Sequence, residues 1–129
     1  MKLNKIEHIA INALDFVKSA EFYEDVLGLK RLNTVDCGGF SITYFELPGD
    51  ARLELFDYRG KNRDIPREES DTGLRHLAFS VTDVAAHEKE LRAMGVNITM
   101  PTTDLTDLGV KALLFTDPNG VTIEFCEKL

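Results

Sequence analysis

The chain contains two versions of one stretch, HIAINALD at residues 8–15 and HLAFSVTD at residues 76–83. In each version apolar side chains alternate with small or polar ones, a pattern typical of a strand with one buried face. Each strand then leads to an aspartate, a residue that often caps the start of a helix. Such self-similarity between the two halves predicts an internally duplicated fold.

The similarity continues beyond these stretches. The helical pattern that follows each strand ends on a glycine, Gly28 in the first half and Gly95 in the second, where a left-handed helix stop favours that residue. Each half then closes on a strand that carries a single acid between apolar neighbours, Glu54 or Glu124. The whole chain is therefore expected to consist of two copies of one module.

Periodicity predicts the order βαβββ in each copy, and hence an α+β fold class. The expected strands span 5–12, 29–36, 40–47 and 51–58 in the first copy and 74–81, 96–100, 109–116 and 120–126 in the second. The expected helices span 16–27 and 84–95, capped by Asp15 and Asp83. We expect a single domain over 1–129, made of module 1–58, connector 59–73 and module 74–129.

Composition limits the class of protein. A chain of 129 residues with 43% hydrophobic content is expected to bury about two thirds of its unfolded surface. The net charge of -7 argues against nucleic-acid partners, which require a basic surface. No apolar run suits a signal peptide or a membrane span, so no membrane association is expected. Two cysteines do not form a disulfide framework, which favours a cytoplasmic location with reduced thiols.

Four metal-binding side chains occupy equivalent places in the two copies. His76 follows His8 by 68 positions, and Glu124 follows Glu54 by 70. Strand alternation places all four on the face opposite the helices. A lone histidine or glutamate on a strand is more often an ordinary surface residue, but four at repeat-related positions favour ligation. We predict one divalent metal per site, with Ni, Co, Zn, Mn or Fe compatible with mixed nitrogen and oxygen ligands.

The same alternation predicts the substrate-binding residues. Asn12, Phe56, Tyr58 and Ser80 fall on the face that carries the metal ligands. The remaining histidine, His87, lies on the second predicted helix and is expected to serve in packing or at the surface. Because the predicted substrate-binding residues share a face with the metal ligands, we expect a small-molecule substrate as the partner.

These residues also carry a family resemblance. The quoted stretches, together with Phe22-Tyr23, GLRHLAFSV at 73–81, and DPNG at 117–120 followed by Ile123-Glu124, resemble the vicinal oxygen chelate superfamily. That superfamily includes glyoxalase I, methylmalonyl-CoA epimerase, extradiol dioxygenases, and fosfomycin- and bleomycin-resistance proteins. The resemblance implies two βαβββ modules that form a cupped eight-stranded mixed sheet, the glyoxalase/bleomycin resistance/dihydroxybiphenyl dioxygenase fold. It also implies a homodimer with metal sites shared between chains.

The ligand pattern is similar to that of glyoxalase I and implies a metal-dependent lyase or isomerase. The expected reaction is proton transfer next to a carbonyl through a metal-bound enediolate, with Glu124 or Glu54 carrying the proton. Glutathione-using glyoxalase I has an arginine and an asparagine four residues after its first and second ligands. Here Asn12 and Tyr58 stand there, which argues against lactoylglutathione as substrate. The alternatives are an extradiol-type dioxygenase and a metal-free binding or resistance protein.

Overall fold

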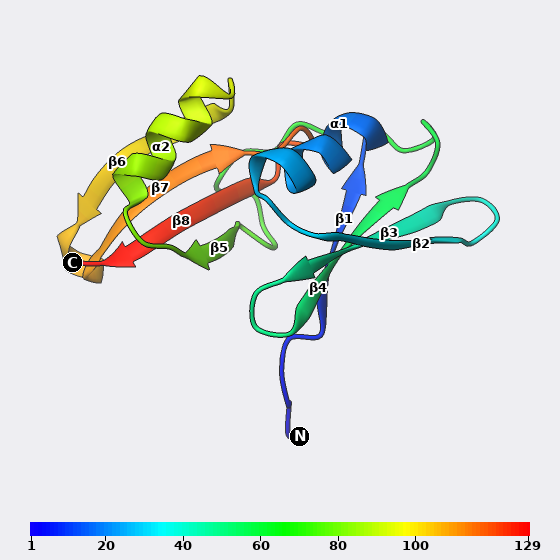
Figure 1. The fold of residues 1–129 in the computed structure, drawn as a ribbon, viewed down its shortest axis with the longest axis horizontal. Coiled ribbons are helices and arrows are strands. Elements are labelled where there is room, and N and C mark those ends of the chain that lie inside the picture. Colours follow the sequence, from blue (N-terminus) through cyan, green and yellow to red (C-terminus); the bar gives the residue numbers. More distant parts are fainter. The chain divides into compact units, whose positions relative to one another are not determined.

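The computed structural model describes all 129 residues, which divide into two compact units, 1–64 and 65–129. The boundary between them lies inside the predicted connector 59–73. Each unit contains one copy of the predicted βαβββ order, shown by the labels in Figure 1. The predicted α+β fold class, two βαβββ modules with mixed sheets, is confirmed. No helix is long and apolar enough to span a membrane.

The first unit is a four-stranded sheet with one helical segment. Its elements are β1 (His8–Ala13), α1 (Phe16–Glu21), the π-helix η1 (Phe22–Val26), β2 (Arg31–Asp36), β3 (Ser41–Leu47) and β4 (Ala51–Asp57). The strand order is β1-β4-β3-β2, with β1 parallel to β4 and the other neighbours antiparallel. Strands distant in sequence, β1 and β4, are thereby adjacent in the sheet.

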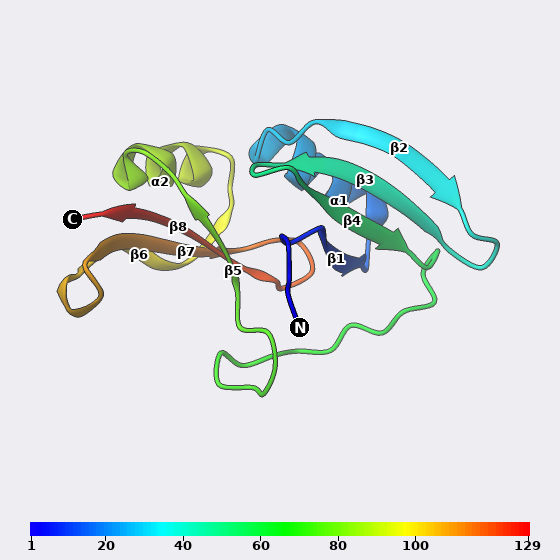
Figure 2. The same cartoon turned by 90° about the horizontal axis from the view of Figure 1, so that it is seen from below.

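The second unit repeats this topology. Its elements are β5 (Leu77–Ser80), α2 (Val84–Ala93), β6 (Asn97–Leu105), the short 3-10 helix η2 (Thr106–Leu108), β7 (Val110–Thr116) and β8 (Thr122–Lys128). The strand order is β5-β8-β7-β6, with β5 parallel to β8. Helix α2 lies against β6, β7 and β8, as Figure 2 shows.

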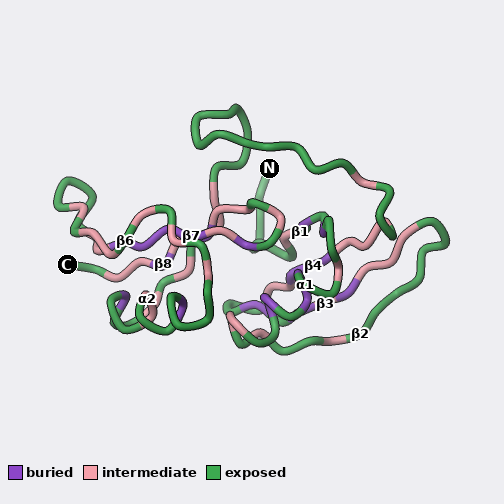
Figure 3. The backbone as a smooth tube through the Cα atoms, turned by 90° about the horizontal axis from the view of Figure 1, so that it is seen from above, coloured by how far each residue is buried: buried purple, intermediate pink, exposed green.

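Alternation along the central strands produces the core of each unit. Leu53 and Leu55 on β4 and Phe45 on β3 are fully buried, as are Leu113 on β7 and Ile123 on β8. Figure 3 shows this burial concentrated along the central strands and on one side of the helices. Since residues two apart on a strand share a face, the intervening side chains, including Glu54 and Glu124, lie on the opposite face of each sheet.

The predicted helix boundaries depend on specific residues. The Asp15 carboxylate accepts a hydrogen bond from the backbone N–H of Lys18 at 3.1 Å, and the Asp83 carboxylate accepts one from Ala86 at 3.0 Å. Both predicted caps are therefore confirmed. Gly28 and Gly95 both have positive φ angles, 67° and 75°, which side chains with a Cβ rarely adopt.

The first helix differs from the prediction because it widens into a π-helix. The Leu27 N–H donates to the carbonyl of Phe22, five residues earlier, at 3.0 Å. This wider winding reduces the rotation between adjacent residues, so the neighbouring aromatic rings of Phe22 and Tyr23 both face the core. Both rings are buried, and the Tyr23 ring packs 6.3 Å from that of Phe45.

The fifth strand is shorter than predicted and the sixth is longer. Strand β5 begins at Leu77, because its parallel partner β8 begins only at Thr122 and pairs Leu77 with Ile123. His76 therefore lies just before the strand. The predicted strand at 96–100 extends through Pro101 to Leu105, with register shifts that accommodate the proline.

Candidate metal centre

The first histidine–carboxylate pair arises from the register of β1 and β4. These parallel strands pair Ala10 with Glu54, so that His8, two residues before Ala10, lies diagonally across from Glu54 on the same face. The Nε2 atom of His8 is 3.7 Å from Oε2 of Glu54. Glu54 is 9% exposed, whereas the His8 side chain is 45% exposed. A buried carboxylate thus faces an accessible imidazole.

The second pair arises from the same register in the other unit. Strands β5 and β8 pair Ala78 with Glu124, and His76 stands two residues before Ala78. The Nε2 atom of His76 lies 2.8 Å from Oε2 of Glu124, a hydrogen-bonding distance. The duplication therefore places one imidazole and one carboxylate at equivalent points of both sheets.

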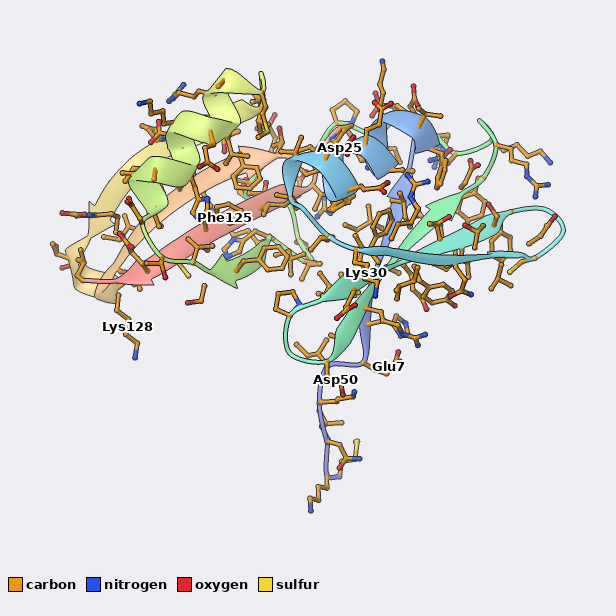
Figure 4. All side chains as sticks on the ribbon, in the orientation of Figure 1. Glu7, Asp25, Lys30, Asp50, Phe125 and Lys128 are labelled. Atoms are coloured by element: carbon orange, nitrogen blue, oxygen red, sulfur yellow. The ribbon has the colours of Figure 1, made fainter.

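Charged neighbours surround His8. The Glu7 carboxylate contacts the Nδ1 atom of His8 and accepts a hydrogen bond from Arg52 Nη2 at 2.5 Å. The hydrogen bond that the Glu7 carboxylate accepts from His8, and then the charge of Glu54, raise the pKa of His8 above its usual value. The same contacts, to His8 and then Arg52, lower the pKa of Glu7. Figure 4 shows Glu7 at the base of β1, near the turn that carries Asp50.

A different neighbour contacts His76. Arg75 Nη1 lies 3.0 Å from Nδ1 of His76, and Arg75 Nη2 donates to Oε2 of Glu69 at 3.1 Å. An arginine thus occupies the place that Glu7 occupies beside His8. Neither Glu7 nor Arg75 was predicted as a site residue from the sequence, although each directly precedes a predicted ligand in the repeat.

In each pair, the distance between the imidazole nitrogen and the carboxylate oxygen is close to the distance between two neighbouring ligands of a divalent metal. Two donors at roughly 2.0–2.2 Å in adjacent octahedral positions lie about 3 Å apart. The observed separations of 3.7 Å and 2.8 Å lie on either side of that value. No group of three or more His, Cys, Asp or Glu side chains arranged to hold a metal occurs, so each pair supplies two donors. The four-ligand set of His8, Glu54, His76 and Glu124 stays a prediction.

Aromatic rings lie on the same face of the first sheet as Glu54. Phe56 and Tyr58, both predicted substrate-binding residues, have ring centroids 6.2 Å apart. Phe40, which the sequence analysis did not single out, lies 5.6 Å from Phe56 and 5.4 Å from Tyr58. All three rings are partly exposed. Phe40 precedes β3, and only the pairing of β3 with β4 brings it to this cluster.

The two polar residues predicted to bind substrate lie on the edge strands β1 and β5. Asn12 pairs in register with Phe56, and Ser80 pairs with Cys126. Both side chains are exposed. Their substrate-binding role, like that of Phe56 and Tyr58, stays a prediction.

The third histidine and the cysteines lie outside the pairs. The His87 ring packs edge-on against Phe125 at 5.4 Å, which agrees with a packing role. Figure 4 shows Phe125 on β8, on the side that α2 covers. Cys37 and Cys126 are both free thiols, and burial followed by the charge of Glu124 raises the pKa of Cys126. A raised pKa disfavours the thiolate, so Cys126 is a poor nucleophile.

Comparison with known families supports the resemblance read from the repeat. The model of the Glyoxalase/Bleomycin resistance protein/Dioxygenase superfamily matches residues 5–125, which include both histidine–carboxylate pairs. The chain belongs to this superfamily. Its members are often metal-dependent enzymes, and they include lyases, transferases and epimerases.

Individual relatives within the superfamily differ in their reactions. The chain is 29% identical to a lactoylglutathione lyase of Haemophilus influenzae, over 95% of this chain and 92% of the relative. It is 27% identical to the metallothiol transferase FosB of Lysinibacillus sphaericus, over 97% of this chain and 83% of the relative. A glyoxylase/bleomycin resistance protein/dioxygenase domain from Frankia superposes with a TM-score of 0.83, at 27% identity over 99% of this chain and all of that domain.

Proposed function

We propose that this protein is a divalent-metal-dependent lyase or isomerase of the glyoxalase I type that transfers a proton next to a substrate carbonyl. One observation carries the proposal: both units place a histidine and a glutamate together through the same strand register. Two imidazoles and two carboxylates together leave two positions of an octahedral ion for substrate oxygens. A dioxygenase iron site has only one carboxylate, so the second glutamate favours proton transfer over oxygen chemistry.

A bound divalent metal would act as a Lewis acid that stabilises negative charge on the substrate oxygens. The chain supplies the proton carrier. A glutamate accepts the proton from the carbon next to the carbonyl and returns it to the neighbouring position. Glu124 and Glu54 are the candidates, because each lies on the face of its sheet opposite the helix and beside a histidine.

The substrate proposed for this site is a small hydroxycarbonyl compound or a thiol conjugate with an apolar part. The partly exposed rings of Phe40, Phe56 and Tyr58 offer such a part a flat surface beside Glu54. Asn12, the neighbour of Phe56 across the strands, would provide a neutral hydrogen bond. An amide cannot hold a carboxylate with the charge and fork geometry of an arginine, so the glycyl end of glutathione is not favoured.

We propose that the site is completed in a homodimer. His8 and Glu54 of one chain would meet His76 and Glu124 of the other, which yields two equivalent sites. Mixing inactive His8→Ala chains with inactive His76→Ala chains is then expected to restore part of the activity, because one site of each mixed dimer is intact. No recovery after demonstrated subunit exchange would argue for sites built within one chain.

The first experiment measures metal content in protein purified without chelator. Glu124→Gln and His76→Ala are each expected to reduce bound metal strongly, while His87→Ala, which removes a histidine that packs against Phe125, leaves it unchanged. Equal metal content in all variants and the parent would contradict the ligand assignment. Metal-free parent protein that still binds small molecules would favour the binding-protein alternative.

The second experiment tests the reaction type. A proton-transfer enzyme exchanges the α-hydrogen of a carbonyl substrate with solvent deuterium, and Glu124→Gln is expected to abolish this exchange. Candidate hydroxycarbonyls, hemithioacetals, acyl-CoA epimers and catechols would be screened in D₂O. Oxygen uptake with a catechol, together with no deuterium incorporation from any carbonyl compound, would instead assign the protein to the extradiol dioxygenases.

A further inference from the structure

The residue before each candidate ligand histidine differs in kind between the two copies. Glu7 precedes His8, and Arg75 precedes His76. Both side chains contact the Nδ1 atom of the following imidazole rather than its Nε2 atom. The fold thus presents the same ring atom to a carboxylate in one unit and to a guanidinium in the other.

These two partners require opposite hydrogen-bond roles of Nδ1. A neutral imidazole has one nitrogen that donates and one that accepts. An ionised carboxylate only accepts, so Nδ1 of His8 must carry the hydrogen that Glu7 receives. A guanidinium only donates, so Nδ1 of His76 must be the acceptor for Arg75.

The distances at Nε2 agree with this assignment. In His8 the Nε2 atom lies 3.7 Å from the Glu54 carboxylate, too far for a hydrogen bond, as expected for a nitrogen without hydrogen. In His76 the Nε2 atom lies 2.8 Å from the Glu124 carboxylate, as expected for an N–H donor. Contacts at both nitrogens of both rings therefore point to the same pair of tautomers.

We infer that the metal-free protein holds its two candidate ligand histidines in opposite tautomers, His8 with a free Nε2 lone pair ready for a metal and His76 with that nitrogen protonated. Glu7 is then a positioning residue that prepares His8, whereas Arg75 opposes ligation by His76. This inference deepens the proposed metal-dependent function and rests on it. It adds a residue in each copy that tunes metal affinity without being a ligand.

Each positioning residue is held by a further contact. Arg52 donates to Glu7 through its side chain at 2.5 Å and its backbone N–H donates to the Glu7 carbonyl at 3.1 Å. The Arg52 guanidinium also lies 4.8 Å from the centre of the Tyr44 ring. Arg75 is held on its far side by Glu69 alone, at 3.1 Å. Glu7 therefore has a partner that is itself held by two further contacts, whereas Arg75 has only Glu69 besides His76.

Metal binding at His76 requires a change of tautomer. The Nε2 hydrogen leaves to solvent, Nδ1 gains a hydrogen from solvent, and Arg75 withdraws from Nδ1, because two donors cannot face each other. No proton is gained or lost overall. At His8 the Nδ1 hydrogen stays on the bond to Glu7, as in the carboxylate–histidine–metal arrangement that orients ligand histidines in other proteins.

The first test needs no metal. Nitrogen-15 chemical shifts of the imidazole rings distinguish the two neutral tautomers, and the chain has only three histidines, so replacing each in turn assigns the signals. At a pH well above the ordinary imidazole pKa, we expect His8 as the Nδ1–H form and His76 as the Nε2–H form. Arg75→Gln is expected to weaken the Nε2–H preference of His76, which the Glu124 carboxylate at 2.8 Å still supports. The same tautomer in both rings of the parent protein would overturn the inference.

The second test is zinc affinity by competition with a chromophoric chelator. Glu7→Gln is expected to weaken zinc binding by about 10- to 100-fold, the usual effect of removing such a carboxylate. Glu7→Asp is expected to recover part of this loss. Arg75→Gln is expected to strengthen binding several-fold, because glutamine can accept the Nδ1 hydrogen.

The matched control is Glu21→Gln, which removes an exposed charge from the end of α1 and leaves the pairs untouched. If Glu7→Gln and Glu21→Gln bind zinc equally, or if Arg75→Gln weakens binding, the inference fails while the proposed function stands. If the parent protein binds no zinc or other divalent metal, the proposed function fails, and the tautomers measured without metal still decide the inference. General destabilisation of the protein would weaken zinc binding in both variants, so it does not explain weaker binding in Glu7→Gln together with stronger binding in Arg75→Gln.

Discussion

Glu88 on α2 joins this helix to β6 through Thr102, and its replacement by glutamine tests this contact. One carboxylate oxygen accepts the backbone N–H of Thr102 at 2.7 Å, and the other accepts Arg92 Nε at 2.8 Å. The Thr102 hydroxyl, then its backbone N–H, then Arg92 lower the pKa of Glu88 from 4.5 to about 2. The buried hydroxyl of Thr102 makes no hydrogen bond. The expected effect of Glu88→Gln on stability is therefore based on the hydrogen bond from the Thr102 backbone N–H.

The expected cost follows from this pKa. A shift from 4.5 to about 2 corresponds to at most about 3 kcal/mol of folding free energy at neutral pH. Arg92 is 55% exposed, so its ion pair contributes under about 0.5 kcal/mol. Glutamine also keeps an oxygen that can accept the Thr102 N–H, which retains about 1 kcal/mol. We therefore expect Glu88→Gln to destabilise the protein by about 1–2 kcal/mol at pH 7.

The pH dependence provides the stricter test. Because the pKa of Glu88 is lowered on folding, its stabilisation is fully present above its unfolded value of 4.5 and is lost as the pH falls towards about 2. The difference between parent and Glu88→Gln in urea unfolding, followed by circular dichroism, is expected to be constant near neutral pH, to shrink as the pH falls below 4.5 and to approach zero only below about pH 2. Glu90→Gln, two residues along α2 and 67% exposed, is the control and should change stability by less than about 0.5 kcal/mol. A difference that persists undiminished in acid would refute the reasoning.

Three further outcomes are expected. Asp15→Ala removes the cap on the Lys18 N–H and should cost about 1 kcal/mol in urea unfolding, whereas Asp25→Asn, at an exposed carboxylate that caps no helix, should cost much less. Leu53→Ala removes a fully buried side chain and should lower the free energy of unfolding by about 2–5 kcal/mol; a loss below 1 kcal/mol would show that the core around it collapses into the space. Turnover of the glutathione hemithioacetal of methylglyoxal should be weak or absent, and rapid turnover in a standard absorbance assay would contradict the argument from Asn12 and the missing arginine.

Much of the fold could be predicted because its signals are local. Alternation along the strands, the caps Asp15 and Asp83, and the positive-φ glycines Gly28 and Gly95 depend on neighbouring residues and on backbone preferences. The π-helix was missed because it depends on a distant partner. Tyr23 must reach the ring of Phe45 on β3, and no helical periodicity contains that requirement.

The candidate site likewise combines residues that the sequence pattern reveals with residues that only contacts between distant segments bring together. The repeat alone selected His8, Glu54, His76 and Glu124, because duplication preserves the positions of strand residues in both copies. It did not select Phe40, which joins the aromatic cluster only through the pairing of β3 with β4. The residue at which β5 begins could also not be predicted from the sequence, because it depends on where its partner β8 begins.

The sequence by itself determined the duplicated βαβββ order, the face on which each side chain lies, and the superfamily. These properties follow from alternation and spacing, which are written along the chain. The tertiary structure decided that β1 pairs in parallel with β4, which brings His8 to Glu54, and that each imidazole meets its own charged neighbour. Strand register is a contact between distant segments, and hydrogen-bond direction depends on atoms across space. The sequence places a carboxylate before His8 and a guanidinium before His76, but only the folded chain shows that both contact Nδ1 of the following ring and so exert opposite influences on that atom.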